Sequence, residues 1–172
     1  HLVNVAPEAP LPACSVPEGK LLRTFDASPQ PTSSLSSSRD GTVLALSRPE
    51  GDTSELVDGA SGRVRGELSR GNGAAVSPDG RWLANWIPFS TTVSLQPVEG
   101  GAGRELAEEV DQILAAAFDS AGARLALIGK QRGSVEARTT QTVVSMREVA
   151  SGDVLWRATF PDEWLISAEF SP

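Results

Sequence analysis

Short apolar runs separated by tight polar turns recur along this chain. In "AAVSPDGRWLANW" (Ala74–Trp86), the polar turn Ser77–Gly80 separates two such runs. Runs of about four to eight residues bounded by Gly, Pro and Asp are typical of β-strands joined by hairpins. The pattern therefore predicts an all-β chain.

The turn and the strand that follows it form a repeat. Copies begin at Ser38 ("SRDGTVLAL"), Ser77 ("SPDGRWLAN") and Asp119 ("DSAGARLAL"), and a fourth start, "AEFSP", ends the chain. A second motif, out of phase with the first, places a glycine before another extended run, at Gly19, Gly62, Gly103 and Gly152. Two interleaved motifs with one period of about 40 residues indicate repeated units.

Each unit is expected to contain four strands. In the second copy we place them at 74–77, 81–88, 91–98 and 104–110. The second strand is apolar on both faces in the first and third copies, at Val43–Leu46 and Leu125–Ile128. That composition predicts strands packed between neighbouring sheets.

One stretch, Glu105–Phe118, carries apolar residues at helical spacing and by itself predicts a helix. The register of the repeat instead places an outer strand there, then a short loop at Asp111 and Gln112, then an inner strand. We follow the register.

Four-stranded units with a Ser-Pro-Asp-Gly turn and a following glycine motif resemble WD-repeat β-propellers over residues 17–172. The Trp-Asp pair typical of that family is replaced by Val57-Asp58, Pro97-Val98 and Glu148-Val149, and no Gly-His pair occurs. Divergent bacterial propellers, including the TolB-like type and those attached to prolyl oligopeptidases, look similar. The resemblance implies a β-propeller segment of four-stranded antiparallel blades.

The repeat divides the chain as follows. We expect a linker or extended segment at 1–16, a partial blade at 17–33, complete blades at 34–70, 71–111 and 112–163, and a partial blade at 164–172. Closed propellers have roughly 4–8 blades. We therefore expect the chain to belong to a longer propeller or to associate with itself.

Composition limits the functional classes. The 172 residues are 40% hydrophobic and carry a formal net charge of −7, so we expect a folded core and no nucleic-acid partner. Cys14 is the only cysteine, which excludes an intrachain disulfide and slightly favours the cytoplasm over the periplasm. The longest apolar run, Ile113–Phe118, is too short to span a membrane.

The chain lacks the usual catalytic residue sets. His1 is its only histidine, and no Walker A, dinucleotide-binding or nucleophile-elbow motif is present. We therefore expect no catalytic, cofactor-binding or metal-binding residues and no enzyme activity. The paired carboxylates Glu108-Glu109 and Asp162-Glu163 are expected at solvated strand ends and loops. Asp40 and Asp79 are expected to hydrogen-bond backbone amides in their turns.

Candidate partner-binding residues gather in two loops. Trp164 precedes an expected inner strand, and the long hairpin loop Gln131–Thr139 projects from the same face with Arg132, Glu136 and Arg138. An aromatic beside arginines is typical of interface hot spots. The other tryptophans, Trp82, Trp86 and Trp156, are expected to pack in the core or between blades.

These observations predict a non-catalytic protein-interaction or sensor module with a protein or peptide partner, or with the remaining blades of its own propeller. Two alternatives stay open. The chain would gate a serine peptidase of the prolyl oligopeptidase type if an α/β-hydrolase domain accompanied it. It would be a TolB-like periplasmic propeller if an export signal preceded His1.

Overall fold

A computed structural model describes residues 12–14, 21–24, 34–47, 53–69, 71, 73–87, 89–132, 140–161 and 170. Every regular element in these residues is a β-strand, so the all-β prediction is confirmed. The strands are β1 (Pro12–Cys14), β2 (Leu21–Thr24), β3 (Ser34–Ser37), β4 (Val43–Ser47), β5 (Thr53–Asp58), β6 (Val64–Ser69), β7 (Gly73–Val76), β8 (Trp82–Trp86), β9 (Thr92–Pro97), β10 (Arg104–Ala107), β11 (Gln112–Phe118), β12 (Arg124–Arg132), β13 (Thr140–Glu148) and β14 (Val154–Pro161).

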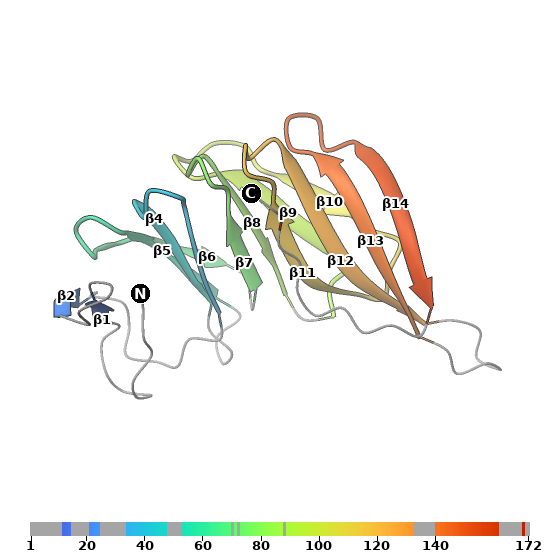
Figure 1. Ribbon diagram of the computed structural model, residues 1–172, viewed down its shortest axis with the longest axis horizontal. Coiled ribbons are helices and arrows are strands. Elements are labelled where there is room, and N and C mark those ends of the chain that lie inside the picture. The colour runs from blue at the N-terminus through green and yellow to red at the C-terminus, as the bar shows by residue number, and fades with distance from the viewer. Residues whose placement is uncertain are drawn as a thin grey trace.

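Three four-stranded antiparallel sheets follow one another in chain order (Figure 1). The first sheet is β3–β6, the second is β7–β10 and the third is β11–β14, and each pairs its strands consecutively. The stretch with helical spacing forms β10 and β11, in two different sheets. The register prediction was right because the tertiary pairing of both segments outweighs their helical propensity.

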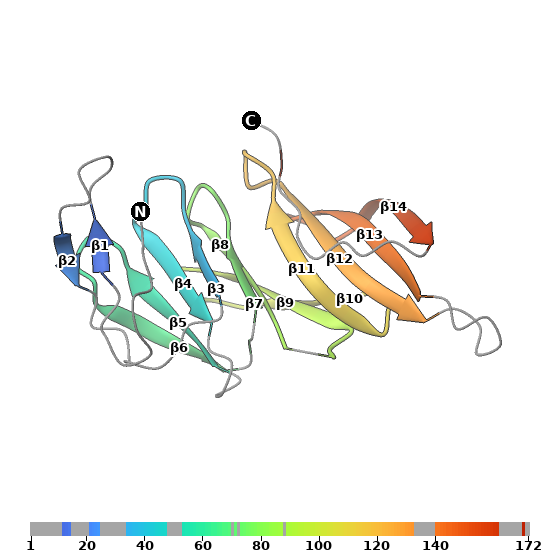
Figure 2. The same ribbon diagram turned by 60° about the horizontal axis from the view of Figure 1, so that its bottom comes forward.

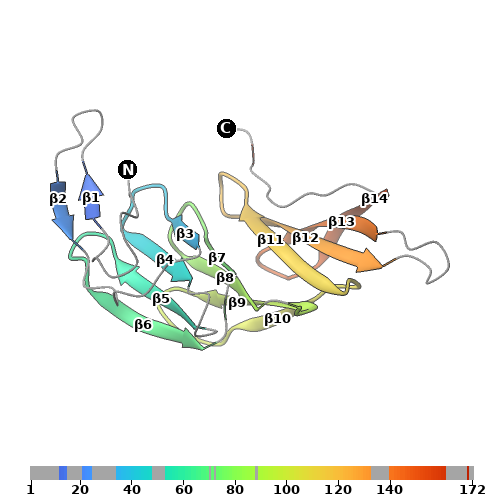
Figure 3. The ribbon, with the colours of Figure 1, turned by 90° about the horizontal axis from the view of Figure 1, so that it is seen from below.

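The sheets stand side by side along the longest axis of the molecule, as Figure 3 shows from below. Strand β7 contacts β3 and β4 of the first sheet and β11 of the third. The first strand of each sheet therefore lies nearest its neighbours, as in the blades of a propeller. A separate pair, β1 with β2, lies beside the first sheet (Figure 2), so the predicted linker includes a short paired strand.

The core lies between the sheets in two clusters. One joins the first and second sheets through Val43, Ala45, Leu56, Ala74, Val76 and Leu83. The other joins the second and third sheets and includes Ala84, Val93, Leu95, Leu125 and Leu127, with Trp82 and Trp86 packed against it. The apolar second strands are buried as predicted. Trp156 differs from the prediction, because 46% of it is exposed on the outer strand β14.

The repeated turn is held by its aspartate, as predicted. Asp40 Oδ1 accepts bonds from the Ser38 hydroxyl at 2.6 Å, the Thr42 amide at 3.0 Å and the Thr42 hydroxyl at 2.8 Å. In the next copy, Asp79 Oδ1 accepts bonds from the Ser77 hydroxyl and the Arg81 amide. Gly41 and Gly80 adopt φ of 70° and 71°, a conformation that glycine adopts without steric cost.

This turn makes a testable prediction about acid stability. The Ser38 hydroxyl and then the Thr42 amide and hydroxyl lower the pKa of Asp40 to about 2. Because the unfolded chain protonates this carboxylate at higher pH than the folded chain, the stability that Asp40 contributes is lost as pH falls from about 4 to about 2. We expect the midpoint of urea denaturation to depend less on pH, between about 4 and about 2, in Asp40→Asn than in the wild type.

The matched control for the acid experiment is Asp153→Asn. Among the described residues, no hydrogen bond or ion pair to the Asp153 carboxylate is found, so this variant shows what the loss of one negative charge does by itself. If Asp40→Asn and Asp153→Asn give the same slope of midpoint against pH, the assignment is wrong.

The two adjacent glutamates of "ELAEEV" have opposite environments, which corrects the prediction for one of them. Glu109 is solvated, with 88% of its side chain exposed. The Glu108 side chain is only 4% exposed and accepts bonds from Arg147 Nε at 2.6 Å and the Ser145 hydroxyl at 2.7 Å. Strand alternation places neighbouring side chains on opposite faces, and only the tertiary structure places an arginine of β13 opposite Glu108.

Candidate partner-binding groove

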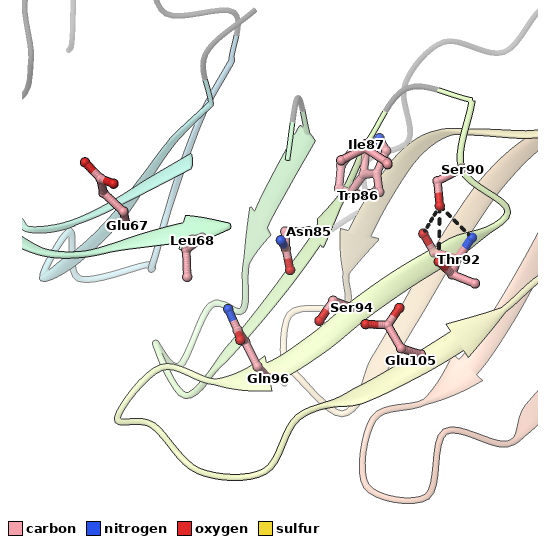
Figure 4. A pocket seen from close by; sticks show the side chains of 10 residues that line it. All are labelled: Glu67, Leu68, Asn85, Trp86, Ile87, Ser90, Thr92, Ser94, Gln96 and Glu105. Atoms are coloured by element: carbon pink, nitrogen blue, oxygen red, sulfur yellow. Dashed lines mark hydrogen bonds between the residues drawn. The ribbon is translucent and has the colours of Figure 1, made fainter. Parts of the chain in front are cut away.

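A cavity of about 440 Å³ opens between the outer strand of the first sheet and one face of the second sheet. We call it the groove (Figure 4). Its lining residues are Glu67, Leu68, Asn85, Trp86, Ile87, Ser90, Thr92, Ser94, Gln96 and Glu105. Among the described residues of the lining there is no histidine, lysine or arginine, and the ionisable side chains there are two carboxylic acids, Glu67 and Glu105.

The polar wall of the groove follows from strand alternation in β9. Val93 and Leu95 are buried in the cluster toward the third sheet, and the residues between them, Thr92, Ser94 and Gln96, line the groove toward the first sheet. Side chains alternate between the two faces of a strand. The second sheet therefore has one apolar face and one face whose outer half is polar.

Asn85, Ser94 and Glu105 form a row across three strands. Asn85 of β8 stands opposite Ser94 of β9, and Ser94 stands opposite Glu105 of β10. Figure 4 shows these side chains on the same side of the sheet, with Gln96 beside them. Glu67, from the first sheet, points away from this row. We call Asn85, Ser94 and Glu105 the polar row.

Apolar residues edge the groove, and one of them, Trp86, packs its side chain toward the third sheet. A Cβ at Gly73 would lie 2.1 Å from Cε2 of Trp86, far inside van der Waals contact, so only glycine lets the indole lie against β7. The neighbouring Ile87 and, from the first sheet, Leu68 complete the rim. The groove thus combines an apolar rim with a polar wall, the usual composition of a binding site.

Phe89 stands at the tip of the β8–β9 hairpin between two lining residues, Ile87 and Ser90. It is 80% exposed and is the non-glycine residue with positive φ, 61°, in the described part of the chain. A bulky residue in this region of φ is uncommon, and its ring gains little from burial. An uncommon backbone conformation at an exposed aromatic residue beside a groove suggests that Phe89 has a functional role.

A second cavity, of about 530 Å³, lies between the same two sheets near the repeated turns. Its charged groups neutralise one another. Arg65 pairs with Asp58 at 2.5 Å and with Glu99 at 3.5 Å, and the Arg65 guanidinium holds the pKa of Asp58 far below its usual value. Arg81 pairs with Asp79 at 3.7 Å. This cavity therefore offers a ligand fewer charged groups without partners than the groove does.

The partner-binding residues predicted from the sequence lie elsewhere. Arg132 ends β12 in the third sheet, is exposed, and donates its backbone amide to Asp111 Oδ2 at 2.5 Å. Glu136, Arg138 and Trp164 fall outside the described residues, so the interface predicted from these four residues stays a prediction. Arg132 shares with Phe89 the end of the molecule where the second and third strands of each sheet are joined.

The sequence reasoning missed the polar row and Phe89. A signal was present in "TVSLQP", where polar and apolar residues alternate. Alternation by itself predicts a solvated polar face, and nothing in the sequence indicates that another sheet would enclose that face as a groove.

Comparison with known proteins supports the fold alone. No protein-family model matches the chain, and no curated protein matches its sequence significantly. Among solved structures, the chain is similar to Kuenenia stuttgartiensis hydrazine synthase, with a TM-score of 0.69 and 16% identity over 88% of this chain and 43% of that one. It is also similar to the β-propeller domain of Myceliophteria thermophila Cps50 (Swd1), with a TM-score of 0.68 and 13% identity over 88% of this chain and 51% of that one.

These likenesses establish a propeller-like architecture. The chain spans about half the length of the structures that it matches, and its three four-stranded sheets correspond to blades. Within the described residues, no helix could cross a membrane. Nor do the described parts of the chain contain a cluster of three or more His, Cys, Asp or Glu side chains suited to hold a metal ion.

Proposed function

We propose that this chain is a non-catalytic protein-interaction module of the WD-like propeller type, and that it binds a segment of its partner in the groove. The observation that carries the proposal is the exposed Phe89 beside a 440 Å³ groove with an apolar rim and a polar wall. The propeller neighbours support an interaction module. The prolyl oligopeptidase and TolB-like alternatives depend on segments outside this chain.

A partner would bury the exposed ring of Phe89. An aromatic ring that is mostly exposed in the free protein can bury a large apolar area on binding, at low cost in side-chain entropy. Its left-handed backbone holds the ring at the hairpin tip. A bond from the Ser90 amide to the Ile87 carbonyl at 3.2 Å closes the turn that carries Phe89, and both of these flanking residues line the groove.

Phe89→Asn tests the proposal. Asparagine tolerates positive φ, so this variant removes the ring and keeps the backbone. We would select binders to the wild-type chain from a displayed library of random dodecapeptides and measure their affinities by fluorescence anisotropy. We expect the selected peptides to bind Phe89→Asn about tenfold or more weakly, as for an interface hot spot.

The matched control is Trp156→Ser, which removes a half-exposed aromatic from β14, in the third sheet. Its affinity for the same peptides should equal that of the wild type. If no peptide is enriched, or if the enriched peptides bind Phe89→Asn as tightly as the wild type, the proposed function of the groove is wrong.

A further inference from the structure

The polar row presents acceptors at regular spacing. Neighbouring strands lie about 4.8 Å apart, so the amide oxygen of Asn85, the hydroxyl of Ser94 and the carboxylate of Glu105 form a line across β8, β9 and β10. The Gln96 amide stands beside this line (Figure 4). Hydroxyls and amides can donate or accept, and an ionised carboxylate only accepts. The row is therefore best matched by a ligand group with several donors.

The charge of the groove also favours a ligand group that donates several hydrogen bonds. Among the described residues, the Glu105 carboxylate has no ion pair. Its neighbour Arg104 points the other way, since its Nη1 lies 3.6 Å from where a Cβ of Gly152 in the third sheet would be. Arg65, in the first sheet, is already shared between Asp58 and Glu99. Within the described part of the chain, the exposed Glu105 side chain thus has no cationic partner, and the chain as a whole carries a net charge of −7.

We infer that the groove binds an arginine side chain of the partner, with its guanidinium on the polar row and its carbon stem on the apolar rim. This inference rests on the proposed function and names the chemistry of the bound segment. A guanidinium carries five donors in a planar fork and no acceptor, so it can bond to the Glu105 carboxylate and to the hydroxyl oxygen of Ser94 together. The ammonium of lysine, as a point charge, satisfies Glu105 but matches the row less well.

The apolar rim indicates which type of residue stands next to that arginine in the bound segment. Long cationic side chains lay their methylene stems on apolar surface, which Leu68 provides here. Ile87 and the exposed Phe89 remain to contact an apolar side chain next to the arginine. The bound segment is thus an arginine with an adjacent apolar residue.

The direct test uses a small probe, N-acetyl-arginine N′-methylamide, titrated into the ¹⁵N-labelled chain. We expect saturable shifts of the side-chain amide resonances of Asn85 and Gln96, assigned from Asn85→Asp and Gln96→Glu. The citrulline analogue, which keeps the shape and loses the charge, should bind about fivefold more weakly, the upper range for a solvent-exposed ion pair. Equal shifts with the citrulline analogue, or shifts confined to other residues, would overturn the inference.

Glu105→Gln and Glu67→Gln form the matched pair of variants. Both remove one carboxylate from the groove lining, but only Glu105 belongs to the polar row (Figure 4). Glu105→Gln should weaken binding of the arginine probe about fivefold, and Glu67→Gln should leave it within about twofold. If the two variants behave alike, the arginine is not held by the polar row.

The two proposals fail in different ways. If the selected dodecapeptides require Phe89 but lack arginine and bind Glu105→Gln normally, the groove is an interaction site and the inference of an arginine ligand is wrong. If the arginine probe binds at the polar row but no peptide depends on Phe89, the inference of an arginine ligand is correct. The proposed role of Phe89 at the hairpin tip is then wrong.

Discussion

Replacing Glu108 with alanine is expected to lower the free energy of unfolding by about 3–5 kcal/mol, the usual cost of removing one partner from a buried ion pair. The Glu108 side chain is 4% exposed and that of Arg147 is 12% exposed. Arg147 also donates to the Gly152 carbonyl at 2.8 Å and to the Ala107 carbonyl. Without Glu108, the guanidinium would keep these neutral acceptors but lose the charge that offsets its burial. Urea denaturation measures the loss.

The adjacent residue supplies the control for this experiment. Glu109 also pairs with an arginine, Arg157, at 2.7 Å, but its side chain is 88% exposed. Glu109→Ala should cost less than about 1 kcal/mol, because solvent screens an exposed pair. Equal costs for the two alanine variants would mean that Arg147 is not buried against Glu108, and that the second and third sheets are joined differently.

Leu83→Ala is expected to cost about 2–5 kcal/mol, as for other buried leucines that leave a cavity. Leu83 is 0% exposed and lies in the cluster that joins the first and second sheets. Its loss therefore weakens the packing between two blades as well as within one. The free energy of unfolding from urea denaturation checks this value.

Leu155→Ala is the matched control, because Leu155 is 49% exposed on β14. We expect it to cost less than about 1 kcal/mol, as for most surface substitutions. If Leu83→Ala were equally mild, the cluster between the first and second sheets would not be a close-packed core.

The contrast between the two inter-sheet spaces explains why a site arises where it does. The second and third sheets meet through leucines, valines and tryptophans, and they enclose the ion pair of Glu108 with Arg147. Between the first and second sheets, apolar packing is carried by Leu83 and its neighbours near the inner strands. Farther out, Asn85, Ser94 and Glu105 line the groove instead. A close-packed inner region thus supports an open polar outer region.

Much of the fold was determined by local sequence. The Ser-Pro-Asp-Gly turn specifies its own hairpin, because the aspartate accepts hydrogen bonds from residues within two positions and the glycine takes a positive φ. Once the turns are placed, the apolar runs between them are short enough only for strands. The repeat then predicts the four-stranded units, even across Glu105–Phe118, where local propensity favours a helix.

The environment of individual side chains was decided by the tertiary structure. Glu108 and Glu109 are identical in type and adjacent in sequence, yet one is buried against Arg147 and the other is solvated. Trp86 packs over Gly73 while Trp156 is exposed. Strand alternation determines which side chains share a face, but what that face meets depends on a sheet some 40 residues away in the chain. For the same physical reason, the sequence determined that β9 has a polar face, and only the neighbouring sheet made that face the wall of a groove.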